Sequence, residues 1–218
     1  MDIRNLEGSI VALVTPFCAD GSVDFAALER LVDFHLQNKT DAILVLGTTG
    51  ESATMTDEED NSVVAAVVKQ VAGRIPVIAG SGSNSTATML DKSLSYQRLG
   101  ADGLLTITPY YNKSNEEGIY QHFKTVADAV DIPCILYNIP GRCGCGISKH
   151  NVERAREIQI AGQPLIQALF SEVNPIPVKE ALSQMGLLDL HYRMPLMPMA
   201  DDTRAALTAA LKEADIIA

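Results

Sequence analysis

Short apolar runs that end in polar or turn-forming residues recur along the first two thirds of the chain. Residues 42–46 form such a run, and its Ile and Val content is typical of a strand buried on both faces. The run ends at Gly47-Thr-Thr-Gly50, where glycine permits a tight turn and close approach to a ligand. Comparable strands are predicted at residues 9–17, 76–80, 103–108 and 134–137.

Amphipathic helices are predicted between these strands. The helix at residues 25–38 repeats its apolar residues at helical spacing, and an acid-rich helix start follows Thr56. Further helices are predicted from residue 85 to residue 100 and at residues 115–130. Strand and helix alternate with a period of roughly 30 residues, which is the length of a βαβ unit and predicts a parallel sheet with helices outside it. Because the polar strand ends gather on one rim, the pattern favours a partial (β/α) barrel of about five parallel strands.

The alternation stops after Ile147, and no sixth, seventh or eighth strand is predicted. The remaining segments predict helices at residues 151–170, 179–185 and 202–214, with proline-rich breaks between them. We therefore expect two domains. Residues 1–148 are predicted to form an incomplete (β/α) barrel, and residues 149–218 a C-terminal helical domain.

Composition excludes several classes of function. The net charge of −10 and the pI of about 4.8 argue against a nucleic-acid-binding protein, which needs a basic surface. No apolar run approaches the roughly 18 residues of a membrane span, and the first seven residues carry acids in place of a signal core. A cytoplasmic protein without membrane partners is expected.

The four cysteines and four histidines do not form a recognisable metal or disulfide pattern. Cys143-Gly-Cys145 has neither a second pair nor a histidine at ligand spacing, whereas a structural zinc site needs four ligands. We expect two small loop residues there, and no metal.

Two strand ends remain open to more than one interpretation. Thr48 and Thr49 either bind a ligand or belong to a strand-to-helix turn in which threonine caps the helix. Tyr110 and Tyr111, taken by themselves, are read more readily as one buried aromatic and one that caps the core.

Four motifs in order resemble the dihydrodipicolinate synthase family, class I aldolases of the pyruvate-lyase superfamily that act in lysine biosynthesis. The motifs are Gly47-Thr-Thr-Gly-Glu51, Thr108-Pro-Tyr-Tyr-Asn112, Tyr137-Asn-Ile-Pro-Gly-Arg142 and Asn174-Pro-Ile-Pro-Val-Lys179. The resemblance implies an eight-stranded barrel with a helical C-terminal domain, assembled as a dimer or tetramer. It also implies condensation of pyruvate with aspartate semialdehyde through a lysine Schiff base, without a cofactor.

The resemblance assigns roles to individual residues. Thr48 and Thr49 would hold the pyruvate carboxylate, and Arg142 the carboxylate of the second substrate. Tyr137, Thr48 and Tyr111 would form a proton relay, with Tyr111 donated across a dimer interface. A family effector site for lysine maps to Ser52, Ala53, Asn84 and Tyr110.

The chain departs from the family at two places. The sixth strand, with its Gly-Ile-Lys-Glu-Ala motif and Schiff-base lysine, is absent together with strands seven and eight, on the order of 70–80 residues. Lys113, Lys149 and Lys179 are expected to be solvated and not to replace it. At the effector site, Thr88 stands where a glutamate often binds the ammonium group, and Asp57 and Asp60 stand where histidine can occur.

Two functions follow from this departure. The chain is either a synthase-family lyase that is inactive as written, or a catalytically dead remnant that binds pyruvate or pairs with an intact homologue. The open sheet edges left by strands one and five favour association.

Overall fold

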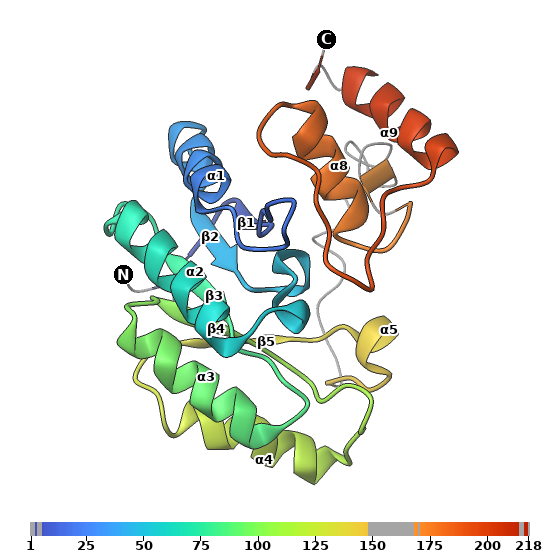
Figure 1. Cartoon of the computed structure of the whole chain (residues 1–218). Helices are drawn as coiled ribbons and strands as arrows, with labels where there is room; N and C mark the ends of the chain where they lie inside the picture. The colour runs from blue at the N-terminus through green and yellow to red at the C-terminus, as the bar shows by residue number, and fades with distance from the viewer. Residues whose placement is uncertain (1–2, 4–5, 148–167, 170, 214–215, 218) are drawn as a thin grey trace. The chain divides into compact units, whose positions relative to one another are not determined.

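A computed structural model describes residues 3, 6–147, 168–169, 171–213 and 216–217 of the 218-residue chain (Figure 1). The chain forms two compact units, Met1–Leu13 with Val32–Ser148 and Val14–Leu31 with Lys149–Ala218. The predicted domain boundary at residues 148 and 149 lies outside the described residues and stays a prediction. The same holds for nearly all of the helix predicted at residues 151–170.

The first unit contains one parallel sheet. Its strands are β1 (Ile10–Ala12), β2 (Ala42–Val45), β3 (Val77–Gly80), β4 (Gly103–Ile107) and β5 (Cys134–Tyr137). They lie in chain order, β1-β2-β3-β4-β5, and every neighbouring pair is parallel. Within the described residues β1 and β5 do not pair, so the sheet is open and the predicted partial barrel of five strands is confirmed.

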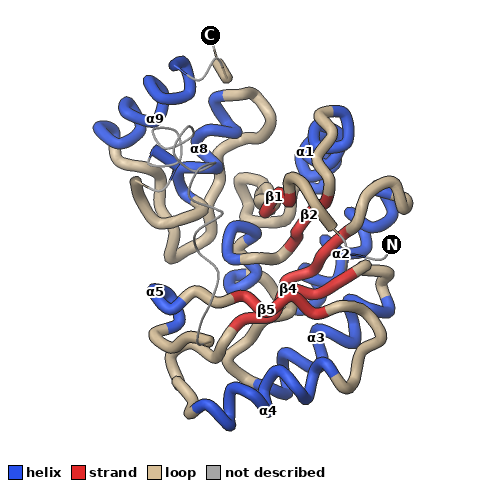
Figure 2. Tube along the Cα trace, turned by 180° about the vertical axis from the view of Figure 1, so that it is seen from behind, coloured by secondary structure: helices blue, strands red, loops and turns tan. Residues whose placement is uncertain are grey.

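Helices follow each strand. They are α1 (Phe25–Gln37), α2 (Asp57–Val71), α3 (Thr86–Arg98), α4 (Glu116–Ala127) and the short α5 (Pro140–Cys143), with two 3₁₀ turns, η2 (Thr48–Gly50) and η3 (Ser52–Thr54). Thr56 caps α2 in a capping box with Glu59, as predicted. Figures 1 and 2 show α2, α3 and α4 against one face of the sheet.

The two faces of the sheet are covered differently. Side chains on the helix-facing side, such as Ile43, Val77 and Leu104, are fully buried under the apolar stripes of the helices. On the other face Ala42 and Ile78 form a cluster with Ile3 from the N-terminal segment. Leu44, Leu105 and Ile135 pack against that cluster and stay half-buried.

The first strand is much shorter than predicted. Residues 9–17 were expected to form it, but only Ile10–Ala12 pair with β2. Pro16 lacks the N–H that a sheet ladder requires, and its carbonyl instead accepts from Asp24 N at 2.9 Å. Phe17 forms an isolated antiparallel bridge with Val23, so the chain leaves the sheet before Thr15-Pro-Phe17.

The C-terminal part of the second unit contains the helices α8 (Ile176–Gln184) and α9 (Asp201–Glu213). They pack through a cluster made by Ile176, Ala181, Met199, Leu207 and Leu211. The prediction of helices at residues 179–185 and 202–214 is confirmed with slightly shifted bounds.

The expectation that Lys179 is solvated is wrong. Its side chain lies in α8 and is fully buried. The Nζ atom donates to the carbonyl of His191 at 2.8 Å and lies 4.6 Å from the ring centre of Phe17 and 5.3 Å from that of Tyr192. An ammonium group over two aromatic faces is held by cation–π attraction, which is strongest where water is excluded.

Acid is expected to destabilise the first unit through His122. This side chain of α4 is 3% exposed and contacts Thr86 Oγ1 at 2.8 Å through Nδ1. Burial lowers the pKa of His122, and backbone groups of Ile107 and Ser83 offset only part of that effect. The unfolded chain therefore takes up a proton that the folded chain does not as the pH falls below about 6.5. The loss of stability reaches up to about 1.4 kcal/mol per pH unit.

We expect His122→Gln to reduce this loss between pH 7 and pH 5, measured by urea unfolding at each pH. The pKa of His35 is also lowered by burial, so its contribution has the same direction and remains in the variant. An unchanged pH dependence in His122→Gln would show that this ring is accessible to protons in the folded state.

Candidate functional site

The turn after β2 has an unusual backbone. Leu46 and Glu51 have positive φ values of 57° and 59° although neither is glycine. Between them η2 is closed by hydrogen bonds from Gly50 N to Gly47 O at 2.9 Å and from Glu51 N to Thr48 O at 3.2 Å. Strained non-glycine backbone of this kind concentrates at functional sites. Thr56, and neither Thr48 nor Thr49, caps the following helix, so the capping interpretation of the two threonines is wrong.

Glycines at the end of β3 allow the turn after β2 to pack closely against it. A Cβ atom at Gly80 would lie 2.4 Å from the carbonyl oxygen of Leu46, well inside van der Waals contact. One at Gly82 would lie 2.5 Å from the Cγ2 atom of Ile107. The two glycines therefore bring the carboxyl ends of β2, β3 and β4 together, where ligands bind in parallel α/β folds.

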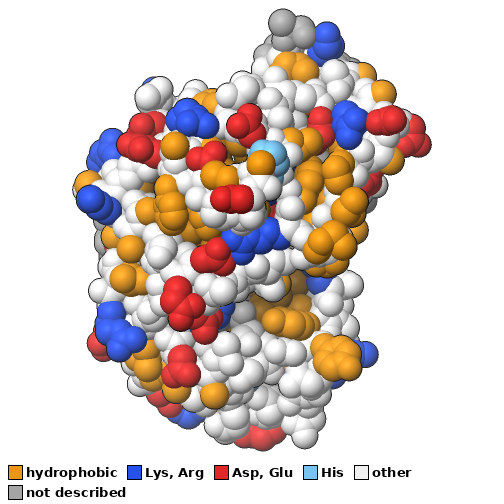
Figure 3. Space-filling model, viewed as in Figure 1, with side chains coloured by type: hydrophobic (Ala, Val, Ile, Leu, Met, Phe, Trp, Pro, Cys, Tyr) orange, Lys and Arg blue, Asp and Glu red, His pale blue; other side chains and the backbone are white. Residues whose placement is uncertain are grey.

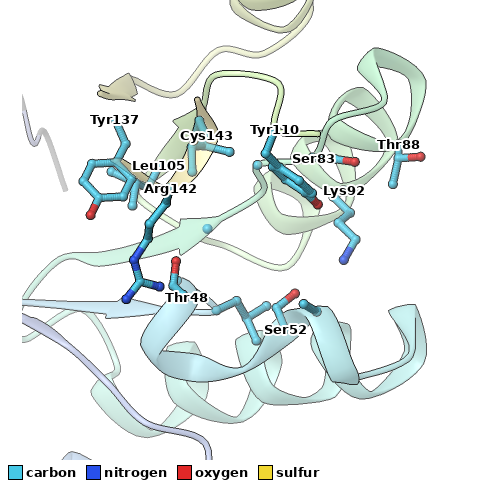
Figure 4. A pocket seen from close by; sticks show the side chains of 16 residues that line it. Thr48, Ser52, Ser83, Thr88, Lys92, Leu105, Tyr110, Tyr137, Arg142 and Cys143 are labelled. Carbon is cyan, nitrogen blue, oxygen red and sulfur yellow. The ribbon is translucent and has the colours of Figure 1, made fainter. Parts of the chain in front are cut away.

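A cavity of about 450 Å³ lies at these strand ends, within the first unit (Figure 4). Among the described lining residues, the charged side chains are two cations, Arg142 and Lys92. The other lining residues are Leu46, Gly47, Thr48, Ser52, Ala53, Gly80, Gly82, Ser83, Thr88, Leu105, Ile107, Tyr110, Tyr137 and Cys143. A cavity whose described lining carries hydroxyl groups and cations, and no carboxylate, favours an anionic ligand.

Three predicted substrate and relay residues meet at one end of the cavity. Figure 4 shows the guanidinium of Arg142, from α5, pointing toward the hydroxyl of Thr48, with the ring of Tyr137 beside it. The described residues offer no hydrogen-bond or ion-pair partner to Arg142, whose side chain is exposed. A guanidinium fork beside two hydroxyl groups matches a small carboxylate.

Two other predicted residues do not join this group. Tyr111 is 93% exposed, has a φ of 66°, and is not among the cavity-lining residues. Thr49 is half-buried and does not line the cavity either. The interpretation of Tyr110-Tyr111 as one buried and one core-capping aromatic is wrong, because Tyr110 is itself 38% exposed and stands at the cavity.

The predicted effector residues lie largely at the other end. Ser52, Ala53 and Tyr110 line the cavity, and Thr88 is beside them. Asn84 does not line it, and its carbonyl accepts from Asn112 Nδ2 at 3.1 Å.

Lys92 is a cavity residue that the sequence analysis missed. It lies one helical turn after Thr88 on α3, and this i, i+4 spacing was the signal that could have placed both on one face. Its Nζ atom is 2.6 Å from Asp60 Oδ2 and 3.3 Å from Asp57 Oδ1. The Asp60 side chain is only 1% exposed, whereas that of Asp57 is 70% exposed.

These carboxylates set the charge of Lys92. Burial lowers the pKa of its amine, but the hydrogen bonds and charges of Asp60 and Asp57 together outweigh burial and raise the pKa above its usual value. Lys92 is therefore a fixed cation at neutral pH and not a nucleophile, since only the neutral amine attacks a carbonyl.

Of the other lysines considered from the sequence, the two described ones, Lys113 and Lys179, do not line the cavity. Lys113 is exposed, Lys149 lies outside the described residues, and Lys179 belongs to the second unit. All four cysteines are free thiols, and Cys143 lines the cavity.

The described residues contain no group of three or more His, Cys, Asp or Glu side chains placed to hold a metal ion. No described helix has the length and apolar character needed to span a membrane. On the face drawn in Figure 3, described Lys and Arg side chains are scattered among acidic and apolar ones.

The chain is similar to known proteins over nearly its whole length. The family model described as "Dihydrodipicolinate synthetase family" matches residues 5–159 and again residues 149–214. The 4-hydroxy-tetrahydrodipicolinate synthase of Laribacter hongkongensis is 39% identical over 290 aligned residues, covering 97% of this chain and 100% of the relative.

Solved structures give the same result. The chloride-inhibited dihydrodipicolinate synthase from Acinetobacter baumannii, complexed with pyruvate, is 34% identical and covers 98% of this chain and 100% of its own, with a TM-score of 0.89. The enzyme from Cyanidioschyzon merolae with lysine bound is 30% identical. The match covers 97% of this chain and 99% of the solved chain, with a TM-score of 0.90.

The alignment also locates the departure from the family. With the Laribacter protein it is 290 positions long against a chain of 218, so at least 72 positions of the relative have no counterpart here. The two ranges matched by the family model overlap at residues 149–159, so the missing positions fall in this part of the chain, after β5. The chain belongs to the dihydrodipicolinate synthetase family and lacks an internal segment of it.

Proposed function

We propose that this chain is a dihydrodipicolinate synthase-type module that binds pyruvate but does not turn it over. The observation that carries the proposal is the end of the cavity where Arg142, Thr48 and Tyr137 meet. This end has groups for binding a carboxylate, while the one lysine among the described lining residues is held as a cation.

The roles follow from chemistry together with the family resemblance. In the intact reaction a lysine amine condenses with the ketone of pyruvate and water leaves; loss of a methyl proton then gives the enamine that attacks aspartate semialdehyde. Thr48 and Thr49 would hold the pyruvate carboxylate, and Arg142 that of the second substrate. Tyr137 and Thr48, whose hydroxyl groups share the cavity, would move protons once an amine is supplied.

Tyr111 would complete this relay only from a second subunit. It is exposed and outside the cavity of its own chain, which supports a donated role in a dimer or tetramer. Its positive φ is a strain that is typical of residues kept for function. We further propose that the assembly acts in the cytoplasm and, by family membership, in lysine and diaminopimelate biosynthesis.

The second candidate function is pairing with an intact homologue, and the open sheet favours it. Within the described residues β1 pairs only with β2, and β5 only with β4. Ile10 of β1 is 45% exposed and Leu136 of β5 is 50% exposed. Unpaired parallel edges invite another chain. Co-expression with a tagged intact synthase would test this, and recovery of the homologue alone would rule it out.

The pyruvate proposal predicts that Arg142→Ala weakens pyruvate binding by roughly 10- to 100-fold when the second substrate is absent. The Arg142 guanidinium, which points toward Thr48, then has only the carboxylate of pyruvate to attract. A charge-assisted hydrogen bond to a carboxylate contributes about 1.5–3 kcal/mol. Arg142→Lys keeps the positive charge but loses the planar guanidinium fork. Its affinity for pyruvate should therefore lie between those of the unmodified chain and Arg142→Ala. Isothermal titration of the purified chain measures both.

Arg98→Ala is the matched control, since Arg98 lies exposed in the last turn of α3 and does not line the cavity. Its affinity for pyruvate should equal that of the unmodified chain. Equal affinities of Arg142→Ala and Arg98→Ala for pyruvate would show that the Arg142 guanidinium does not take part in pyruvate binding.

A further inference from the structure

The carboxylate of Asp60 sits at the centre of a preformed ammonium site. Asp60 is fully buried in α2, and its Oδ2 accepts from Ser52 Oγ at 2.8 Å and from Tyr96 OH at 3.3 Å. Its Oδ1 is buried and lacks a hydrogen-bond partner in the described residues. A buried carboxylate held only by hydroxyl groups would leave its charge uncompensated, which proteins avoid by adding a cation.

The cation is supplied by the chain itself. The Nζ of Lys92 is 2.6 Å from Asp60 Oδ2 and 3.3 Å from Asp57 Oδ1, and its side chain is 16% exposed. In Figure 4, Lys92 lies on the far side of Tyr110 from Arg142, with Ser52 below it. An ammonium group has three donors, and the two carboxylates use two of them.

We propose that Lys92 fills, from within the chain, a site for a primary ammonium group at one end of the cavity. A free amine therefore finds this end occupied in the unmodified protein, and only an anion can enter at the Arg142 end. Removal of the Lys92 side chain opens a site of matching chemistry for a small alkylammonium ion. The inference rests on the ion-pair geometry and holds whether or not the chain binds pyruvate.

Chemical rescue of Lys92→Ala tests the site. The variant leaves Asp60 buried without its cation, and breaking such a pair should lower the Tm by roughly 6 °C or more. Propylammonium chloride replaces the three deleted carbons and the ammonium group. At tenfold excess over its Kd it should raise the Tm of the variant by about 3 °C or more relative to NaCl of equal ionic strength.

Three controls isolate the site. The unmodified chain should respond equally to propylammonium chloride and NaCl, because Lys92 occupies the site. The double variant Asp60→Asn with Lys92→Ala should gain nothing from the amine, because the carboxylate is gone. Propan-1-ol, which has the carbons without the charge, should not rescue Lys92→Ala.

Each outcome decides the proposal. An unchanged Tm in Lys92→Ala, or equal responses of the single and double variants to the amine, would overturn it. If Lys92→Ala does not fold alone, refolding yield replaces Tm as the readout. A higher yield with propylammonium than with NaCl then supports the site, and equal yields overturn it.

Discussion

The purified chain is expected to show no synthase turnover with pyruvate and aspartate semialdehyde, and no covalent adduct when pyruvate is added with borohydride. Formation of the enamine needs a neutral amine held against the ketone carbon. Hydroxyl groups and a guanidinium can orient the carboxylate but cannot form that bond. The loss is therefore expected to be complete, and intact-mass spectrometry measures the absence of the adduct directly.

We expect none of the described lysines near the candidate site to replace the absent one. Lys92 lines the cavity, but its ion pair with Asp60 at 2.6 Å raises the pKa of the amine and keeps it protonated. Lys113 is exposed outside the cavity. A Schiff-base lysine needs the reverse environment, in which burial lowers the pKa of the amine.

Insertion of a family segment carrying strands six to eight after residue 148 should restore both turnover and the adduct. The matched control is the same insertion with its Schiff-base lysine changed to alanine, which should restore the barrel without the adduct. Turnover by the unmodified chain, abolished by alanine at Lys113, Lys149 or Lys179, would show that a substitute amine exists. An active insertion chimera, by contrast, would confirm that the rest of the rim is intact.

The five strands could be predicted because parallel strands are buried on both faces. The apolar runs at residues 42–46 and 134–137 lie within a residue of β2 and β5. The first strand could not be bounded in this way, since residues 13–17 are also buried although the chain has already left the sheet after Ala12. Apolar composition reports burial, and pairing depends on backbone donors that composition does not describe.

The candidate site was predicted where residues follow a strand and missed where they lie on a helix. Tyr137 ends β5, and Thr48 and Arg142 follow strand ends, so the topology alone brings them to one rim. Lys92 reaches the same cavity from the interior of α3, where a lysine ordinarily indicates a solvated face. Its position depends on Asp60, 32 residues earlier, and a pairing across two helices has no local signal.

The burial of Lys179 contradicts the solvated side chain that the sequence predicts, and it has a large consequence for stability. The sequence predicts a surface charge because charged residues are rarely buried. In α8, however, it lies one turn after Ile176, on the buried side of the helix, and is 0% exposed. Its stem fills core volume, while its ammonium group donates to His191 O and faces the rings of Phe17 and Tyr192.

Lys179→Ala is expected to lower the free energy of unfolding of the second unit by roughly 3–5 kcal/mol, because it creates a cavity and leaves the His191 carbonyl without this donor. Lys179→Met fills the volume but loses the hydrogen bond and the cation–π contacts, so roughly 1–3 kcal/mol is expected. Denaturant unfolding followed by circular dichroism measures both. Lys212→Ala, in the exposed last turn of α9, is the matched control and should change stability by less than about 0.5 kcal/mol. If Lys179→Ala is no more destabilising than Lys212→Ala, the Lys179 amine is in solvent, as its residue type alone would predict.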